Sequence, residues 1–375
     1  MVYFDNAATT PLNKKVKDLI VNSLDCFANP TSGYGLARKE YFKIEEAKKT
    51  ILQKLKANPN DYKIYFTSGA TESNNWVIDS VAKDYKGTYK NKIISTSIEH
   101  PSVYNKLKAL EKEGFDVVYV KPQDNGVVNV EDIENAIDER TILVSVMAVN
   151  NQIGTKQPIE KIGRLCKEKN VQFHSDFTQA IGHIPIDVEK FNLDFLTAST
   201  HKFGGMKGVG FVILKKDYTM NNLLYGGSAV VRSGTLNTLG ITTTSLALSE
   251  AVDNETNNQM VTGKLKKYLI SELLYIGIDF DLNSPLIDTV NNIVNISFYN
   301  IDGELLKTYL EAQSILVSTT SACETGIEIT NRILEEINVP REYIKGTIRL
   351  SFSPENTFSE CDNFINAIKN FLGGN

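Results

Sequence analysis

The chain has 375 residues, of which 42% are hydrophobic and 23% are charged, and its net charge is -5. This composition is ordinary for a globular protein, and the mildly acidic balance excludes the basic footprint typical of nucleic-acid binding. No apolar run approaches the ~18 residues of a membrane span, and the first residues, MVYFDNAATTPL, form no secretory signal. We therefore expect a cytoplasmic protein with about two domains.

Helical and strand patterns alternate along the first part of the chain. Apolar residues at helical spacing predict helices over 14–26, 37–57, 71–85, 101–114 and 159–170. Apolar runs predict strands within 63–69, 91–100, 115–121, 141–150, 171–176, 194–200 and 208–214. This alternation predicts an α/β fold in which a largely parallel sheet carries helices on both faces.

The pattern changes after about residue 240. A long helix is predicted over 242–275, followed by a strand (291–300), a helix (303–313), two strands (314–320 and 346–352) and a final helix. This mixture predicts a smaller α+β domain. We therefore expect a large domain over 1–240, whose first residues can pack on the small domain, and a small domain over 241–375.

The four cysteines are far apart and form no CxxC motif, and no cysteine–histidine cluster has zinc spacing. We therefore expect neither a metal site nor, in a reducing cytoplasm, disulfides. Cys166 lies in a helical apolar pattern and is expected in the core, whereas Cys26 and Cys361 suggest no chemical role. Cys323 differs because its surroundings, STTSACETG, are small and polar, which is a poor setting for a buried structural thiol.

Polar segments follow the predicted strands at the edge where ligands bind in open α/β sheets. The segments are TSGATES, SIEHP, VNNQIG, SDFTQA and ASTHKF. Each alone has an ordinary explanation as a cap, a turn or a surface residue. Together, a strand-end Asp176, Lys202, His100 and a Gly/Thr helix start suit pyridoxal phosphate. A lysine forms its Schiff base, an acid pairs with its ring nitrogen, and a helix N-terminus holds its phosphate.

The order of these motifs resembles that of the cysteine desulfurases. These belong to the fold-type I, aspartate aminotransferase-like, pyridoxal phosphate-dependent transferases of aminotransferase class V. The motifs that carry the resemblance run from residue 3 to residue 353 and are YFDNAATTP, NPTS, FTSGATESNN, EHPSV, VNNQIG, HSDFTQAIGHIPIDV, STHKFGGMKGVG, RSGTLNT, SAC and IRLSFS. The resemblance therefore covers nearly the whole chain.

The resemblance implies a role for each matching residue at the cofactor ring. Lys202 would form the Schiff base, Asp176 would pair with the ring nitrogen, and Gln179 would hydrogen-bond the ring oxygen. His100 would stack on the ring face, and Asn151 would lie beside the ring.

The resemblance also assigns the phosphate and the substrate. The residues that would hold the phosphate are Ala70, Thr71, Ser199 and His201, together with Thr235 from a neighbouring subunit. That last contact implies a homodimer. Arg349 and Asn29 would bind the substrate carboxylate, which the planar fork of an arginine matches.

The implied reaction is the removal of sulfur from L-cysteine. Lys202 would take the Cα proton, and His100 is a candidate proton shuttle. Cys323, acting as the thiolate, would take the sulfur as a persulfide and release L-alanine. The persulfide would pass to an acceptor protein of iron–sulfur cluster assembly or tRNA thiolation, and thiamine synthesis also stays open.

Three segments depart from the family pattern, and two alternatives stay open. The loop LLYGGSAVVRSGT is shorter and more apolar than usual, NPTSGYG lacks a histidine, and ETGIEITNRIL after Cys323 is atypical. One alternative is a selenocysteine lyase or another class V enzyme such as an aminotransferase, although a transaminase needs no thiol at Cys323. The other is a non-catalytic cofactor-binding scaffold, against which the intact Lys202 argues.

Overall fold

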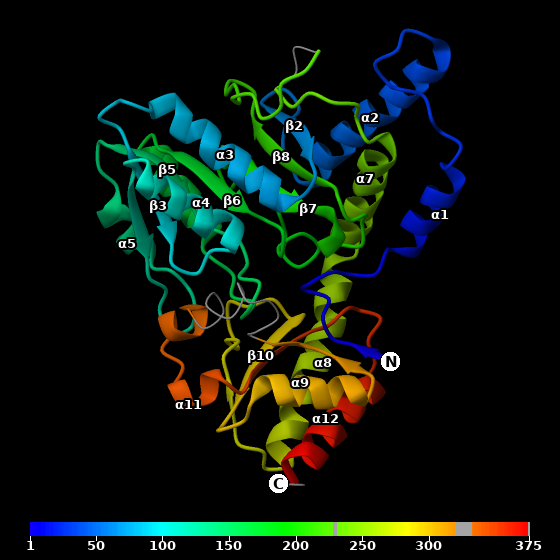
Figure 1. Cartoon of the computed structure of the whole chain (residues 1–375), viewed down its shortest axis with the longest axis vertical. Coiled ribbons are helices and arrows are strands. Elements are labelled where there is room, and N and C mark those ends of the chain that lie inside the picture. The colour runs from blue at the N-terminus through cyan, green and yellow to red at the C-terminus, as the bar shows by residue number, and fades with distance from the viewer. Residues whose placement is uncertain (228–230, 320–331, 374–375) are drawn as a thin grey trace.

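The computed structural model describes residues 1–227, 231–319 and 332–373, and Figure 1 shows them arranged around two main sheets. The larger sheet lies in the upper part of the view and the smaller sheet in the lower part. None of the helices in the described ranges is long and apolar enough to cross a membrane.

Seven strands form the larger sheet, in the order β2-β8-β7-β6-β5-β3-β4. Their bounds are β2 (Tyr62–Thr67), β3 (Lys92–Thr96), β4 (Asp116–Val120), β5 (Thr141–Ser145), β6 (Gln172–Asp176), β7 (Phe195–Ser199) and β8 (Gly210–Lys215). Among the described strands of this sheet, β8 alone runs opposite to the other six, because the short connection from β7 leaves no room for a crossover helix. The largely parallel sheet predicted from the sequence is confirmed.

Helices cover both faces of this sheet. Their bounds are α1 (Lys14–Asn22), α2 (Gly35–Lys54), α3 (Ala70–Tyr85), α4 (Pro101–Lys112), α5 (Val130–Ala136), α6 (Ile159–Glu168) and α7 (Thr238–Asp253). In β5, Leu143 packs with α3 and α4, whereas its neighbour Val144 belongs to the core of α2, α5, α6 and α7. Both faces of β5 are thus buried, which explains why the sequences of such strands are unbroken runs of apolar residues.

The described part of the smaller sheet has four strands in the order β12-β13-β10-β9. Its elements are α8 (Glu255–Tyr275), β9 (Phe280–Leu282), β10 (Ile293–Phe298), α9 (Gly303–Ala312), β12 (Ser318–Thr319), α11 (Arg341–Ile344), β13 (Thr347–Ser351) and α12 (Phe358–Gly373). The chain also begins here, because β1 (Val2–Tyr3) pairs with β11 (Ile315–Leu316). Phe4 is fully buried in the core of this part.

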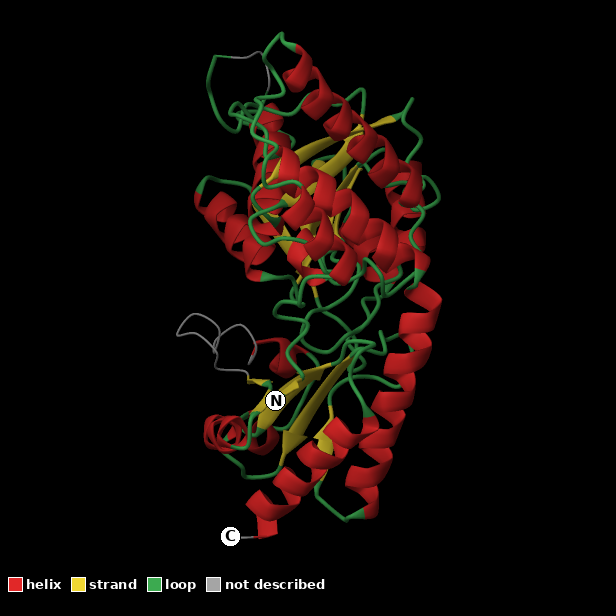
Figure 2. Ribbon diagram, turned by 90° about the vertical axis from the view of Figure 1, so that its right-hand side faces the viewer, coloured by secondary structure: helices red, strands yellow, loops and turns green. Residues whose placement is uncertain are grey.

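The change from one core to the other lies at a break between two helices. The sequence predicted one helix over 242–275, but α7 ends at Asp253 and α8 begins at Glu255. Leu248 of α7 belongs to the core of the larger sheet, whereas Leu265 of α8 belongs to the second core. Figure 2 shows helices running beside both parts. The domain boundary predicted near residue 240 therefore precedes the change of core by one helix.

Candidate active site

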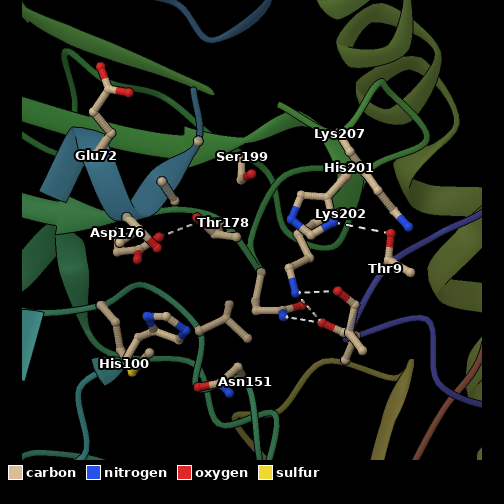
Figure 3. A pocket seen from close by; sticks show the side chains of 18 of the residues that line it. Thr9, Glu72, His100, Asn151, Asp176, Thr178, Ser199, His201, Lys202 and Lys207 are labelled. Atoms are coloured by element: carbon tan, nitrogen blue, oxygen red, sulfur yellow. Dashed lines mark hydrogen bonds between the residues drawn. The ribbon is translucent and has the colours of Figure 1, made fainter. Parts of the chain in front are cut away.

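A cavity of about 720 Å³ opens beyond the carboxyl ends of β2, β5, β6 and β7. It lies where the two parts of the molecule meet, and Figure 3 shows many of its lining side chains. The predicted residues that line it are Ala70, Thr71, His100, Asn151, Asp176, Gln179, Ser199, His201, Lys202 and Arg349. Strand ends far apart in the sequence meet at this edge, as expected for an open α/β sheet.

Three predicted site residues do not appear in this lining. Asn29 instead closes its own loop, since its Oδ1 accepts hydrogen bonds from Thr31 N (3.1 Å) and Thr31 Oγ1 (2.9 Å). Thr235 is exposed outside the cavity, so its predicted contact with a neighbouring subunit stays a prediction. Cys323 lies outside the described residues.

Lys202 is held by the N-terminal segment of the chain. Its Nζ donates to Ala7 O and to Ala8 O, both at 2.7 Å. Burial, with the positive charge of Arg349, lowers the pKa of Lys202 to about 8. About a tenth of this amine is therefore neutral, and so nucleophilic, at pH 7, far more than for an exposed lysine. No role was predicted for Ala7 or Ala8, because no local pattern in this run of small residues indicates a contact with Lys202.

Asp176 is the last residue of β6 and is almost completely buried. Its Oδ2 accepts a hydrogen bond from Asn74 Nδ2 (2.7 Å), and its Oδ1 accepts one from Thr178 N (2.8 Å). Both carboxylate oxygens are thus fixed in position at the cavity wall, as Figure 3 shows for the Thr178 contact. Neither Asn74 nor Thr178 was singled out from the sequence.

His100 is the N-cap of α4. Its Nδ1 accepts a hydrogen bond from Ser102 N (3.1 Å), and Pro101 occupies the first helical position. Burial lowers the pKa of His100, with Lys202 adding to the effect and Asp176 opposing it. The imidazole is therefore neutral near neutral pH.

The N-terminus of α3 also lines the cavity. Its first residues, Ala70 and Thr71, line the cavity beside Ser199 and His201, where the unpaired N–H groups of a helix start attract an anion. A Cβ at Gly210 would lie 2.5 Å from the carbonyl carbon of Gly69, so this approach of β8 requires glycine.

Glu72 in the first turn of α3 would repel an anion if it were unpaired. Burial raises its pKa, but hydrogen bonds from Arg232 and Ser68 outweigh burial and lower it. Arg232 NH2 lies 3.3 Å from Glu72 Oε2. The negative charge of Glu72 is thereby balanced, and exposed Lys207 adds a positive charge to the cavity lining.

Arg349 in β13 brings the smaller sheet to the cavity. Its NH1 donates to Asn151 O (3.0 Å), and its NH2 lies 2.8 Å from Asp5 Oδ1. The side chain is only 6% exposed, and its Nε has no partner among the residues that the structure describes. The guanidinium is therefore anchored while keeping donor capacity for a carboxylate.

Comparison with known proteins assigns the family. The family model for aminotransferase class-V matches residues 2–364. The chain is 38% identical to cysteine desulfurase IscS of Clostridium botulinum, over 99% of this chain and 94% of that protein. A solved NifS-like protein superimposes with a TM-score of 0.93 at 36% identity, covering 100% of both chains. A structure of SspA in complex with cysteine covers 95% of this chain and 100% of its own, with a TM-score of 0.82 and 30% identity.

The chain belongs to the cysteine desulfurases of the class V aminotransferase family. Enzymes of this family depend on pyridoxal phosphate. The fold, the enzyme class and the cofactor predicted from the sequence are therefore confirmed.

The cavity of this cysteine desulfurase fits pyridoxal phosphate. Two buried oxygens of lining residues, Asn151 Oδ1 and Thr178 Oγ1, have no hydrogen-bond partner in the described part of the chain, as expected where a polar ligand binds. Lys202 would hold the cofactor aldehyde, Asp176 the ring nitrogen and the α3 N-terminus the phosphate. When bound, the cofactor supplies an electron sink for charge at the substrate Cα.

Proposed function

We propose that this chain removes sulfur from L-cysteine, releases L-alanine and carries the sulfur as a persulfide on Cys323. The observation that carries this proposal is the placement of the two ends of segment 320–331. Before it, Ser318 of β12 pairs with Arg349 in the cavity wall. After it, Arg332 NH2 donates to Glu99 O (3.1 Å), directly beside His100. The described residues on either side of segment 320–331 thus contact Arg349 of the cavity lining and Glu99, the neighbour of His100 in the chain.

Each cavity residue has a chemical task in this reaction. Arg349 would bind the substrate carboxylate through its planar fork. The neutral amine of Lys202 would take the Cα proton, because its pKa of about 8 is close to the operating pH. Asp176 would keep the cofactor nitrogen protonated. Asn151, beside Arg349, and Gln179 would orient the groups at the ring.

The sulfur transfer balances without another reactant. The thiolate of Cys323 would attack the substrate sulfur, forming an S–S bond as the C–S bond breaks. The electron pair of the C–S bond stays on the substrate carbon, which gains a proton and becomes the methyl group of alanine. Each of the two sulfur atoms formally loses one electron and the carbon gains two, so no external oxidant is needed.

We further propose that the enzyme is a cytoplasmic homodimer that passes its persulfide to a protein acceptor of iron–sulfur assembly or tRNA thiolation. Large apolar side chains are exposed on α1, on α2 and on the segment between them. This exposed apolar surface supports the proposal that a second copy of the chain binds there. These side chains are Val21, Leu24, Phe27, Tyr34, Leu36, Tyr41 and Phe42. Tyr225 is also exposed and precedes Thr235, the residue predicted to contact a neighbouring subunit, by ten residues in the chain. Exposed apolar groups clustered in this way mark protein interfaces.

The deciding experiment is the intact mass of the holoenzyme after incubation with L-cysteine and no reductant. We expect a gain of one sulfur atom, located by peptide mapping on Cys323. Cys26→Ser is the matched control, since Cys26 is exposed and should not affect the gain. If Cys323→Ala released sulfide from L-cysteine as fast as the parent enzyme, the carrier role of Cys323 would be wrong.

A further inference from the structure

A single buried amide links the two wall residues Asp176 and His100. Asn74, in the second turn of α3, is fully buried. Its Nδ2 donates to Asp176 Oδ2 (2.7 Å) and to Ser102 Oγ (2.9 Å). Both N–H groups of the amide therefore donate a hydrogen bond, one to Asp176 and one to Ser102.

These contacts set the direction of the next hydrogen bond. A carboxylate such as Asp176 can only accept, so the NH2 group of Asn74 must face it. The second N–H of Asn74 then donates to Ser102 Oγ, which leaves the Ser102 hydroxyl hydrogen free to donate. The nearest acceptor is His100 Nδ1, 2.8 Å away. Nδ1 therefore accepts from both the hydroxyl and the backbone N–H of Ser102.

The hydrogen bond to the amide oxygen of Asn74 favours the same orientation of the side chain. Asn74 Oδ1 accepts from Thr197 Oγ1 (2.5 Å), and Thr197 Oγ1 lies 3.1 Å from His174 Nε2. The Nδ1 of His174 lies 2.8 Å from Ser145 Oγ. Burial lowers the pKa of His174 to about 4, so this histidine stays neutral with its proton on Nε2. Every polar atom of the Asn74 side chain is thus fixed, and the amide cannot flip.

We propose that Asn74 is a positioning residue that couples Asp176 to His100, holding the carboxylate directly and, through Ser102, holding His100 as the neutral tautomer with its proton on Nε2. The nitrogen of His100 remote from Ser102 then offers a hydrogen bond to developing negative charge. Proton uptake at Nδ1 first requires the Ser102 hydroxyl to turn away. The catalytic meaning of this coupling rests on the proposed function, whereas the coupling itself can be measured without catalysis.

The test is nuclear magnetic resonance of holoenzyme with ¹⁵N-labelled histidine. The chain has four histidines, so His→Gln variants at His100, His174, His183 and His201 can assign the signals. In the parent enzyme we expect His100 to be neutral with its proton on Nε2. In Asn74→Ala the Ser102 hydroxyl is free to accept from a protonated Nδ1. The pKa of His100 should therefore rise by ~0.7, the equivalent of one hydrogen bond.

Asn75→Ala is the matched control for loosened packing of α3. Asn75 is the next residue on this helix and also contacts Ser102, but it donates to the backbone oxygen, Ser102 O (3.0 Å). Its loss should leave the His100 tautomer and pKa unchanged. The charges that act most on His100, those of Asp176 and Lys202, are the same in all these variants.

Ser102→Ala keeps the inference testable if Asn74→Ala does not fold. It should also raise the pKa of His100, because the neutral ring loses the hydrogen bond from the Ser102 hydroxyl. The double variant should add nothing to Ser102→Ala, because Asn74 acts on His100 only by orienting that hydroxyl. An unchanged His100 pKa in Ser102→Ala, or a fully additive double variant, would overturn the coupling. If the His100 signals behaved as expected but no sulfur reached Cys323, the coupling would stand and the proposed function would fail.

Discussion

At the scale of single residues, the cavity works by balancing a few buried charges. Burial is the largest influence on Lys202, and Arg349 lowers its pKa further, while Asp5 and Asp176 oppose both. Asp5 at the same time pairs with Arg349, at 2.8 Å. Lys202 is therefore protonated less often than an exposed lysine, while the buried positive charge of Arg349 is balanced by Asp5.

The lowered pKa of Lys202 predicts how cofactor loading depends on pH. Only the neutral amine attacks the aldehyde, and its fraction rises about tenfold per pH unit below a pKa of about 8. The rate at which apoenzyme gains the visible absorption of bound pyridoxal phosphate should therefore rise with pH and level off above about pH 8. Stopped-flow absorbance over a pH series measures this rate. Lys202→Ala is the control and should gain no such band, and a rate that stayed flat from about pH 6 to about pH 8 would contradict the assignment.

At the scale of elements, close approaches between backbones hold the helices on the large sheet. In α6, a Cβ built at Gly163 would lie 1.8 Å from Phe191 O and 3.3 Å from a ring carbon of Phe173. A backbone oxygen cannot move aside as a flexible side chain can. Glycine at this position therefore lets α6 lie against the segment that leads into β7.

Gly163→Ala should lower the free energy of unfolding by about 3 kcal/mol, because the new methyl group has no space. Urea denaturation followed by circular dichroism measures the loss. Gly373→Ala is the matched control, since Gly373 is also helical but its Cβ would meet nothing within 4 Å. The control should change stability by less than ~0.5 kcal/mol. Alanine is a better helix former than glycine, so helix propensity alone would not lower stability. A loss in Gly163→Ala no larger than the change in the control would contradict the close contact with Phe191.

At the scale of the whole molecule, the two cores meet beside the cavity, where Arg349 of the smaller sheet contacts Asn151. A small apolar cluster joins them, in which Ile98 and Ile153 of the larger part pack with Leu334 and Ile337 of the smaller part. This cluster lies next to Glu99 and positions the chain that follows segment 320–331. On the far side of the larger part, the exposed apolar surface around α1 and α2 is the proposed dimer interface.

Phe42→Glu should convert the proposed homodimer to a monomer, because a buried unpaired carboxylate at an interface is unfavourable. Phe42 is 65% exposed in the single chain. Light scattering after size-exclusion chromatography measures the change, and the monomer should also lose cofactor faster on dialysis if Thr235 acts across the interface. Tyr275→Glu, at the end of α8 in the smaller part, is the control and should stay dimeric. A parent enzyme that is itself monomeric would contradict the proposal.

Most of the elements, and the polar residues at their ends, can be predicted from the amino-acid sequence. Strands that are buried on both faces consist mostly of apolar residues, and Asp176 and Ser199 are the last residues of two buried strands. Lys202 and His100 stand one turn beyond a strand, so an open parallel sheet brings them to one edge. These features depend on local periodicity and on a general rule of sheet topology, which the sequence displays directly.

The contacts between distant segments follow from tertiary packing and could not be predicted from the sequence. The N-terminal segment enters the smaller part through β1, and that placement brings Ala7 to Lys202 and Asp5 to Arg349, 344 residues away. The same packing gives Asn74 its partners on β6, β7 and α4. Such contacts arise from how whole elements pack, and no local period in the chain encodes them.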